Sequence, residues 1–238
     1  MPTTSAGNSD CVYNSVCLSR QDCGRDCIRY AEMKYLLEHS GLPKAQMRRT
    51  ELEGRQIDLD AYKELQGIKD GILDFVREGR SLYIFSCNTG NGKTTWACKL
   101  LKAYFNEIWS GNGFRPRGYF THLATYLADC KRQIDHPDED FERLKGIIHD
   151  VPLLVLDDVG SGVLSPYEQG IVLELVEHRI NSELATIYTA NLRDDDLKRS
   201  VGTRLKSRMY DLSTVIEFKG TDMRRGGSST SQRNLLHP

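Results

Sequence analysis

Long hydrophobic runs are absent from this sequence of 238 residues. The longest apolar stretch, Val151–Leu156, has six residues, whereas a helix that crosses a bilayer needs about 20. The first ten residues, MPTTSAGNSD, contain neither a basic segment nor an apolar core, so they do not predict a secretory signal. We therefore expect a cytoplasmic protein that has no membrane partner.

An excess of charge of one sign is absent as well. The 32 Lys and Arg residues nearly balance the 33 Asp and Glu residues, which gives a net charge of −1. No overall positive field would attract nucleic acid, so a contact with DNA or RNA requires a local basic patch. Residues 197–210 carry five basic side chains and no acid, and residues 135–142 carry five acids and no Lys or Arg. We expect the acidic segment to face solvent or a protein partner rather than DNA.

Cysteine is rare outside one short segment. Of seven cysteines, four fall within the first 27 residues, with the spacing C-x5-C-x5-C-x3-C. In a reducing compartment such a cluster binds metal more often than it forms disulfides, and four thiolates satisfy tetrahedral zinc. The spacing departs from the C-x2-C pairs of common zinc ribbons, so two alternatives stay open: His39 replaces one thiolate, or no metal binds. The predicted zinc ligands are Cys11, Cys17, Cys23 and Cys27.

The pattern of apolar residues changes at residue 81. Before it, helical periodicity predicts helices over 28–40 and 58–77, with polar residues between them. After it, short apolar runs alternate with helical patterns, which is typical of an α/β fold with a parallel sheet between helices. The predicted strands cover 81–86, 117–121, 153–157, 185–190 and 214–218, and the predicted helices cover 93–109, 122–134, 165–182 and 194–209.

A phosphate-binding loop follows the first predicted strand. Two glycines let the backbone turn so that its N–H groups point at phosphate oxygens, and the helix that follows adds the positive end of its dipole. Lys93 would reach the β- and γ-phosphates of ATP, and Thr94 would hold Mg²⁺. Cys87 stands where the usual pattern has its first Gly. The predicted nucleotide-binding residues are Asn88, Thr89, Gly90, Asn91, Gly92, Lys93, Thr94 and Thr95.

A second acidic element follows the third predicted strand. The buried run Pro152–Leu156 would deliver Asp157 to the carboxyl edge of the sheet, where open α/β folds bind ligands. Asp157 would support Mg²⁺, and Asp158 would orient or deprotonate the attacking water. A Glu is one methylene longer, so Asp158 would stop about 1 Å short of the best water position, and a misplacement of that size can cost about a hundredfold in rate. We therefore expect slow hydrolysis.

Polar residues further along the chain favour an ATPase that works in an assembly. Asn191 ends the fourth predicted strand and would contact the γ-phosphate or the water. Arg204 and Arg208 lie four residues apart, so they share one helix face, which suits an arginine supplied to a neighbouring subunit. A solvated basic face remains the alternative interpretation of these two arginines.

Several of these residues also carry a resemblance. The sequence resembles the DnaC/DnaI family of bacterial and phage replicative helicase loaders over about residues 11–225. The N-terminal cysteine cluster resembles the zinc-binding, helicase-docking domain of the DnaI branch. The matching segments are Ser40–Lys44, LLVLDDVG with Ser165 and Tyr167 soon after it, Thr189–Leu192, Leu197, Val201–Met209 and Phe218–Arg224.

The resemblance implies an AAA+ ATPase fold and assembly on a hexameric DnaB-type helicase. It implies that Asn191 acts as sensor 1, Arg208 as an arginine finger and Arg224 as sensor 2. It also implies a contact with single-stranded DNA near Lys131, Arg132, Ser165 and Tyr167. The domains expected on this basis are a zinc-binding docking domain at 1–45, a linker at 46–57, the ATPase domain at 58–225 and a disordered tail at 226–238.

Three other functions stay open at this stage. An IstB-type transposition helper shares the ATPase core, and the sequence discriminates it poorly. A nucleotide-gated adaptor with negligible hydrolysis would fit Asp158. A small-molecule kinase would need a lid, and no lid motif is evident. The main expectation is a loader that places its helicase on single-stranded DNA, with ATP, Mg²⁺ and zinc as cofactors.

Overall fold

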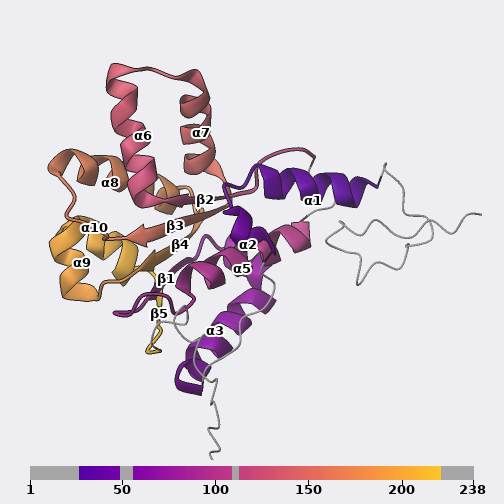
Figure 1. Cartoon of the computed structure of the whole chain (residues 1–238), viewed down its shortest axis with the longest axis horizontal. Coiled ribbons are helices and arrows are strands. Elements are labelled where there is room, and N and C mark those ends of the chain that lie inside the picture. Colours follow the sequence, from indigo (N-terminus) through magenta and orange to yellow (C-terminus); the bar gives the residue numbers. More distant parts are fainter. Residues whose placement is uncertain (1–26, 49–55, 109–112, 221–238) are drawn as a thin grey trace, which may run out of the picture.

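The computed structural model describes residues 27–48, 56–108 and 113–220. Five parallel strands form one sheet with the order β2-β3-β4-β1-β5. Figure 1 shows helices on both sides of this sheet. The strands are β1 Ser81–Phe85, β2 Gly118–His122, β3 Leu153–Val159, β4 Ala185–Ala190 and β5 Thr214–Glu217.

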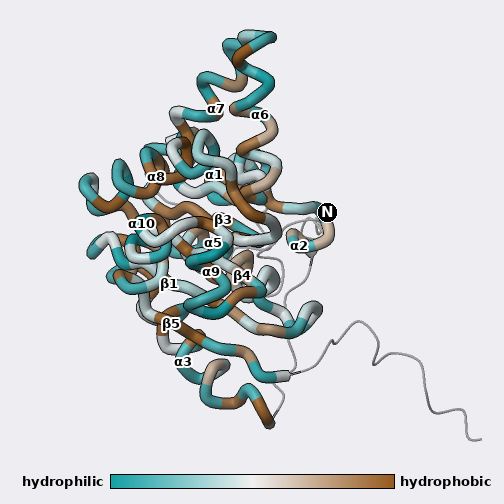
Figure 2. The backbone as a smooth tube through the Cα atoms, turned by 90° about the vertical axis from the view of Figure 1, so that its left-hand side faces the viewer, coloured by the Kyte–Doolittle hydropathy of each residue, from teal (hydrophilic) through white to brown (hydrophobic). Residues whose placement is uncertain are grey.

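Alternating side chains of the strands form two separate cores. In β1, Leu82 and Ile84 point to one face, and Tyr83 and Phe85 point to the other. The first face is covered by α1, α3, α4 and α5, and the second by α6 to α10. Figure 2 shows the hydrophobic strands inside these layers. The helices are α1 Ile28–Glu38, α2 Lys44–Arg48, α3 Leu59–Asp70, α4 Ile72–Arg77, α5 Lys93–Ile108, α6 Leu123–Asp135, α7 Glu139–Asp150, α8 Pro166–Asn181, α9 Asp194–Val201 and α10 Thr203–Lys206.

The sequence prediction of an α/β fold with five strands is confirmed, and each strand lies within two residues of its predicted bounds. Two predicted helices are broken at glycines. Gly71 separates α3 from α4 in the segment predicted as one helix over 58–77. Gly202, with φ of 86°, separates α9 from α10, and a π-helical segment over Ser207–Asp211 then replaces the rest of the predicted helix 194–209. A φ of that value is one that glycine adopts without strain.

Helix α7 is a helix that the sequence analysis did not predict. Its first turn holds three of the acids of the segment 135–142, and Asp138 caps it by accepting a hydrogen bond from the backbone N–H of Asp140. Acidic side chains at a helix N-terminus offset the positive end of the helix dipole, so the cluster has a local structural role. In both views α6 and α7 stand side by side and project from the rest of the molecule.

The N-terminal helices pack directly on the sheet. Met33 and Leu36 of α1 belong to the same buried cluster as the strands. The backbone N–H of Phe120 in β2 donates to the carbonyl of Ser40 at 2.7 Å. Gly41, with φ of 67°, lies so close that a Cβ there would be 2.3 Å from the Phe120 oxygen. Helix α2 occupies the start of the predicted linker 46–57, and the domain boundary at residue 45 stays a prediction.

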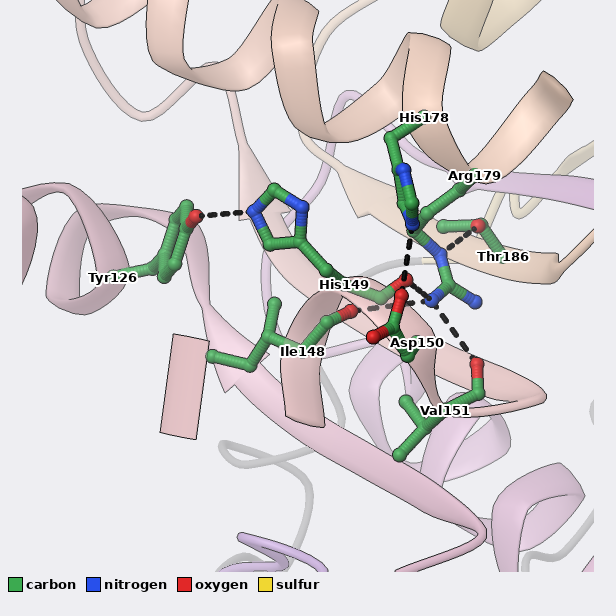
Figure 3. Close-up of polar contacts among 8 residues, drawn as sticks. All are labelled: Tyr126, Ile148, His149, Asp150, Val151, His178, Arg179 and Thr186. Carbon is green, nitrogen blue, oxygen red and sulfur yellow. Dashed lines mark hydrogen bonds and ion pairs between the residues drawn. The ribbon is translucent and has the colours of Figure 1, made fainter. Parts of the chain in front are cut away.

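A buried arginine forms hydrogen bonds with the backbone at the amino end of the sheet. Arg179 of α8 is 1% exposed. Its guanidinium donates to four carbonyl oxygens and to the Thr186 hydroxyl, and most of these groups appear in Figure 3. Two of the carbonyls end α7, where the negative end of the helix dipole favours a cation. Arg179 of α8 therefore connects the end of α7 to the starts of β3 and β4.

No helix within residues 27–48, 56–108 and 113–220 is long and apolar enough to cross a membrane.

Candidate functional site

The loop between β1 and α5 lies at the carboxyl end of the sheet. Gly90 and Gly92 have φ values of 72° and 98°, which let the loop turn back on itself. The Lys93 ammonium, 7% exposed, donates to the Asn88 carbonyl at 3.0 Å and to Asn91 Oδ1 at 3.2 Å. Its charge is therefore held inside the curve of the loop, at the N-terminus of α5.

Asp157 is the centre of a hydrogen-bond cluster at the end of β3. Thr94 of α5 donates its hydroxyl to Asp157 Oδ1 at 2.8 Å, and Thr189 of β4 donates to the same oxygen at 2.5 Å. His122, the last residue of β2, places Nδ1 3.0 Å from Asp157 Oδ2. Asp157 is 3% exposed, so its carboxylate is fixed by three neighbouring elements.

Asp158 and Asn191 contact each other beside this cluster. Asn191 Nδ2 donates to Asp158 Oδ1 at 3.1 Å, and the backbone N–H of Asp158 donates to Thr189 Oγ1 at 3.0 Å. Asp158 has φ of 58°, an uncommon conformation for a residue with a side chain. Such strain persists where the surrounding structure holds it, and it is frequent at functional sites.

The chemistry of these groups fits a magnesium nucleotide. Thr94 and Asp157 bring a hydroxyl and a carboxylate together, and oxygen ligands of these types suit Mg²⁺. The amide nitrogen of Asn91 is buried in the loop and has no hydrogen-bond partner among the described residues. Such a buried donor beside an ammonium group is suited to a phosphate oxygen.

The thiol of Cys98 faces the same region from α5 and takes no part in this chemistry. Burial, with a smaller effect from the charge of Asp157, raises the pKa of Cys98 to about 12. A thiol with that pKa stays protonated at neutral pH and is a poor nucleophile and metal ligand.

The two arginines predicted on one helix face do lie together. Arg204 Nη2 lies 2.9 Å from Glu177 Oε1 on α8, and Arg208 Nε lies 3.5 Å from the same oxygen. The side chains are 67% and 41% exposed. Arg208 is part of the π-helical segment, a rare geometry that is frequent at functional sites. Both arginine side chains are therefore accessible at the surface.

Three of the four candidate DNA-contact residues have local polar partners, and the fourth, Tyr167, is exposed. Lys131 of α6 lies 2.8 Å from Glu168 of α8, and Ser165 caps α8 in a reciprocal contact with Glu168. Arg132 pairs with Asp129 on its own helix. Tyr167 is 49% exposed, and Val163 nearby is 79% exposed.

The zinc prediction falls mostly outside the described residues, as does Arg224. Cys11, Cys17 and Cys23 are not described, and Cys27 is a partly exposed free thiol. His39 Nδ1 lies 2.9 Å from the Tyr35 carbonyl and its ring stacks on Tyr35. Within the described part of the chain, no group of three or more His, Cys, Asp or Glu side chains is placed to hold a metal.

Two residues of the site were missed by the sequence analysis. His122 and Thr189 both contact Asp157, but they come from strands far apart in the sequence. A signal was available for each. His122 ends a strand at the carboxyl edge, and Thr189 stands two residues before Asn191, so it points to the same face of β4.

The parallel sheet with strand order β2-β3-β4-β1-β5 carries a glycine-rich loop at its carboxyl edge, and a solved helicase-loader structure shares this fold. No protein-family model matches the chain. The chain is 24% identical over 191 residues to the replicative helicase loader DnaI of Bacillus subtilis (strain 168), which covers 71% of this chain and 57% of that protein. It is 25% identical over 162 residues to the replicative helicase loader DnaC of Escherichia coli (strain K12), which covers 68% of this chain and 60% of that protein.

A crystal structure of the DnaC helicase loader superimposes with a TM-score of 0.62 and 24% identity, covering 74% of this chain and 100% of the other. The protein is therefore a distant homologue of the DnaC and DnaI helicase loaders. The chain spans less than two thirds of the length of these two curated loaders.

Proposed function

We propose that this protein is an ATP-dependent loader that binds a hexameric DnaB-type replicative helicase and places it on single-stranded DNA. The observation that carries the proposal is the cluster around Asp157, where the first turn of α5, β2, β3 and β4 supply polar groups to one point. Distant homology to helicase loaders supports the choice of this task over other uses of an ATPase core.

The nucleotide site supplies an assembly switch. Lys93 and the loop amides hold the phosphates, Thr94 and Asp157 hold Mg²⁺, and Asn91 adds a donor toward a phosphate oxygen. Magnesium held by Thr94 and Asp157 would supply positive charge beside the phosphates. Asn191 holds the Asp158 carboxylate 3.1 Å away, so the group that orients water and the group that senses the γ-phosphate move together.

A second subunit completes the site. Arg208 and Arg204 are held at the surface by Glu177 and serve the nucleotide of a neighbouring subunit, while Arg224 serves the nucleotide of its own. The N-terminal cysteine module binds zinc and docks on the helicase. Lys131, Arg132, Ser165 and Tyr167 lie near the DNA, where the exposed ring of Tyr167 stacks on a base.

The test is ATP turnover by the full chain with a DnaB-type helicase, with single-stranded DNA, and with both. We expect turnover to rise with both partners. Arg208→Ala removes this rise and leaves ATP binding intact, because the arginine acts on the neighbour's nucleotide. Arg199→Ala, a change at an arginine of the same basic segment that is 76% exposed, serves as the matched control and keeps the stimulation. A monomer that hydrolyses ATP at its full rate and responds to neither partner would contradict the proposal.

A nucleotide-gated adaptor is the second candidate, and the position of Asp158 favours it. Asn191 already donates a hydrogen bond to its short carboxylate, which therefore has less freedom to contact a water molecule. Turnover that stays near background with helicase and DNA present, together with tight ATP binding, would select the adaptor over the loader with active hydrolysis.

A further inference from the structure

Three segments that are far apart in the sequence meet where β5 ends. Asp58 Oδ1, just before α3, accepts hydrogen bonds from the backbone N–H groups of Lys219 at 2.7 Å and Gly220 at 3.1 Å. From the other side, Asn88 Nδ2 of the phosphate-binding loop donates to the carbonyls of Lys219 at 3.4 Å and Gly220 at 3.2 Å. The turn Lys219–Gly220 is therefore held between α3 and the loop.

The contact at Asp58 is close and specific. Asp58 is 4% exposed, and a buried carboxylate needs donors such as these two amides. It stands at the N-cap of α3 but does not cap that helix with its side chain, because the carboxylate is turned to residues 219 and 220. A Cβ on Gly220 would lie 2.4 Å from Asp58 Oδ2, so only glycine lets the turn approach so closely.

A second contact from the same helix supports the first. Tyr62, one turn after Asp58, packs its ring edge-on against Phe218 at 5.6 Å and against Trp96 of α5 at 5.3 Å, measured between ring centroids. Trp96 lies in the first turn of the helix that begins at Lys93. The start of α3 thus contacts the end of β5 and the nucleotide-binding helix together.

We propose that Asp58 is a positioning residue for ATP turnover. It fixes the Lys219–Gly220 turn against Asn88, and so ties the segment that follows β5 to the phosphate-binding loop. This role rests on the proposed function of the nucleotide site. It also connects the loop to the start of α3.

The first experiment needs no nucleotide. Backbone amide hydrogen exchange is measured in the full chain and in Asp58→Ala, with Asp60→Ala, an exposed acid in the first turn of the same helix, as the matched control. We expect exchange at Lys219 and Gly220 to speed up about tenfold or more in Asp58→Ala, and exchange in loop residues 86–92 to speed up with it. Unchanged exchange in the loop would overturn the coupling.

The second experiment is a double-mutant cycle on ATP turnover with Asp58→Ala and Asn88→Ala. If Asp58 acts through the contact of residues 219 and 220 with Asn88, Asp58→Ala lowers kcat about tenfold in the parent and has little further effect once the Asn88 side chain is removed. Asp58→Asn keeps an acceptor oxygen, so it restores part of the rate. A purely structural role predicts additive losses, and additive losses would overturn the proposal.

The two proposals fail in different ways. A parent chain that does not bind ATP would overturn the proposed function and this role with it. A parent chain that binds and hydrolyses ATP, with unchanged loop exchange or additive losses in the Asp58 variants, would overturn the role of Asp58 alone.

Discussion

The amino and carboxyl ends of the sheet differ in how completely their buried polar groups are hydrogen-bonded. At the amino end, the guanidinium of Arg179 donates to five acceptors of the chain itself. At the carboxyl end, Asn91 Nδ2 is buried without a partner among the described residues, and Asp158 has a strained backbone. A fully satisfied buried charge indicates a structural contact, whereas unmatched donors and strain indicate a site that is completed by a ligand.

The largest effect is expected on ATP binding, from a change at Lys93. Lys93→Ala should weaken ATP binding by about 100-fold or more, because it removes the ammonium that lies at the N-terminus of α5, while the free energy of unfolding stays nearly constant. Binding of a fluorescent ATP analogue and urea unfolding measure the two effects. Lys63→Ala, a change at an exposed lysine of α3, is the matched control and should leave both unchanged. A large loss of unfolding free energy in Lys93→Ala would show that this lysine, like Arg179, has a structural role.

The reverse pattern is expected at Arg179. Arg179→Ala leaves buried carbonyl oxygens without donors and should lower the free energy of unfolding by about 3–5 kcal/mol. Arg179→Lys, which cannot reach all five acceptors, should recover only part of this loss. Urea unfolding measures both, with Arg143→Ala, at a side chain 71% exposed, expected to change the free energy by less than about 0.5 kcal/mol. An unchanged free energy of unfolding in Arg179→Ala would show that this arginine does not stabilise the amino end of the sheet, and the contrast with the carboxyl end would then fail.

A smaller effect is expected at Asp158. Asp158→Glu lengthens the side chain by one methylene and should raise kcat about tenfold in the presence of helicase and DNA, because the carboxylate then reaches further toward the water. Steady-state turnover at saturating ATP measures the effect, with Asp150→Glu, at an exposed acid of the amino end, as the control. An unchanged or lower kcat in Asp158→Glu would show that reach does not limit hydrolysis.

The smallest effect concerns the ion pair between α6 and α8. Hydrogen bonds from Lys131 and Ser165 lower the pKa of Glu168 from its ordinary value of 4.5 to about 2. A carboxyl with a depressed pKa stabilises the fold above the pKa of the unfolded chain, and this contribution is lost as pH falls toward 2. The difference in unfolding free energy between wild type and Glu168→Gln should therefore be constant above about pH 5 and should shrink between about pH 4.5 and 2. A difference that does not change with pH would contradict this assignment, and Glu64→Gln, at an exposed acid, serves as the control.

The sequence predicted the strands well because they are buried on both faces. A strand of a covered parallel sheet is a short, nearly continuous apolar run, and such runs are visible without tertiary information. The helix breaks at Gly71 and Gly202 were not predicted, because a glycine inside a periodic segment continues a helix in some proteins and ends it in others. Helix α7 was missed because its first turn is almost wholly acidic, a composition also typical of solvated loops.

The sequence by itself determined where a phosphate-binding site is predicted, because the G-x-G-K-T-T loop and the apolar strand with two aspartates require only local geometry. Only the tertiary structure decided which groups meet there. His122 and Thr189 reach Asp157 because their parallel strands end at the same edge of the sheet, and Asp58 reaches residues 219 and 220 because α3 begins beside the end of β5. Contacts between residues this far apart depend on packing, which no short segment of sequence encodes.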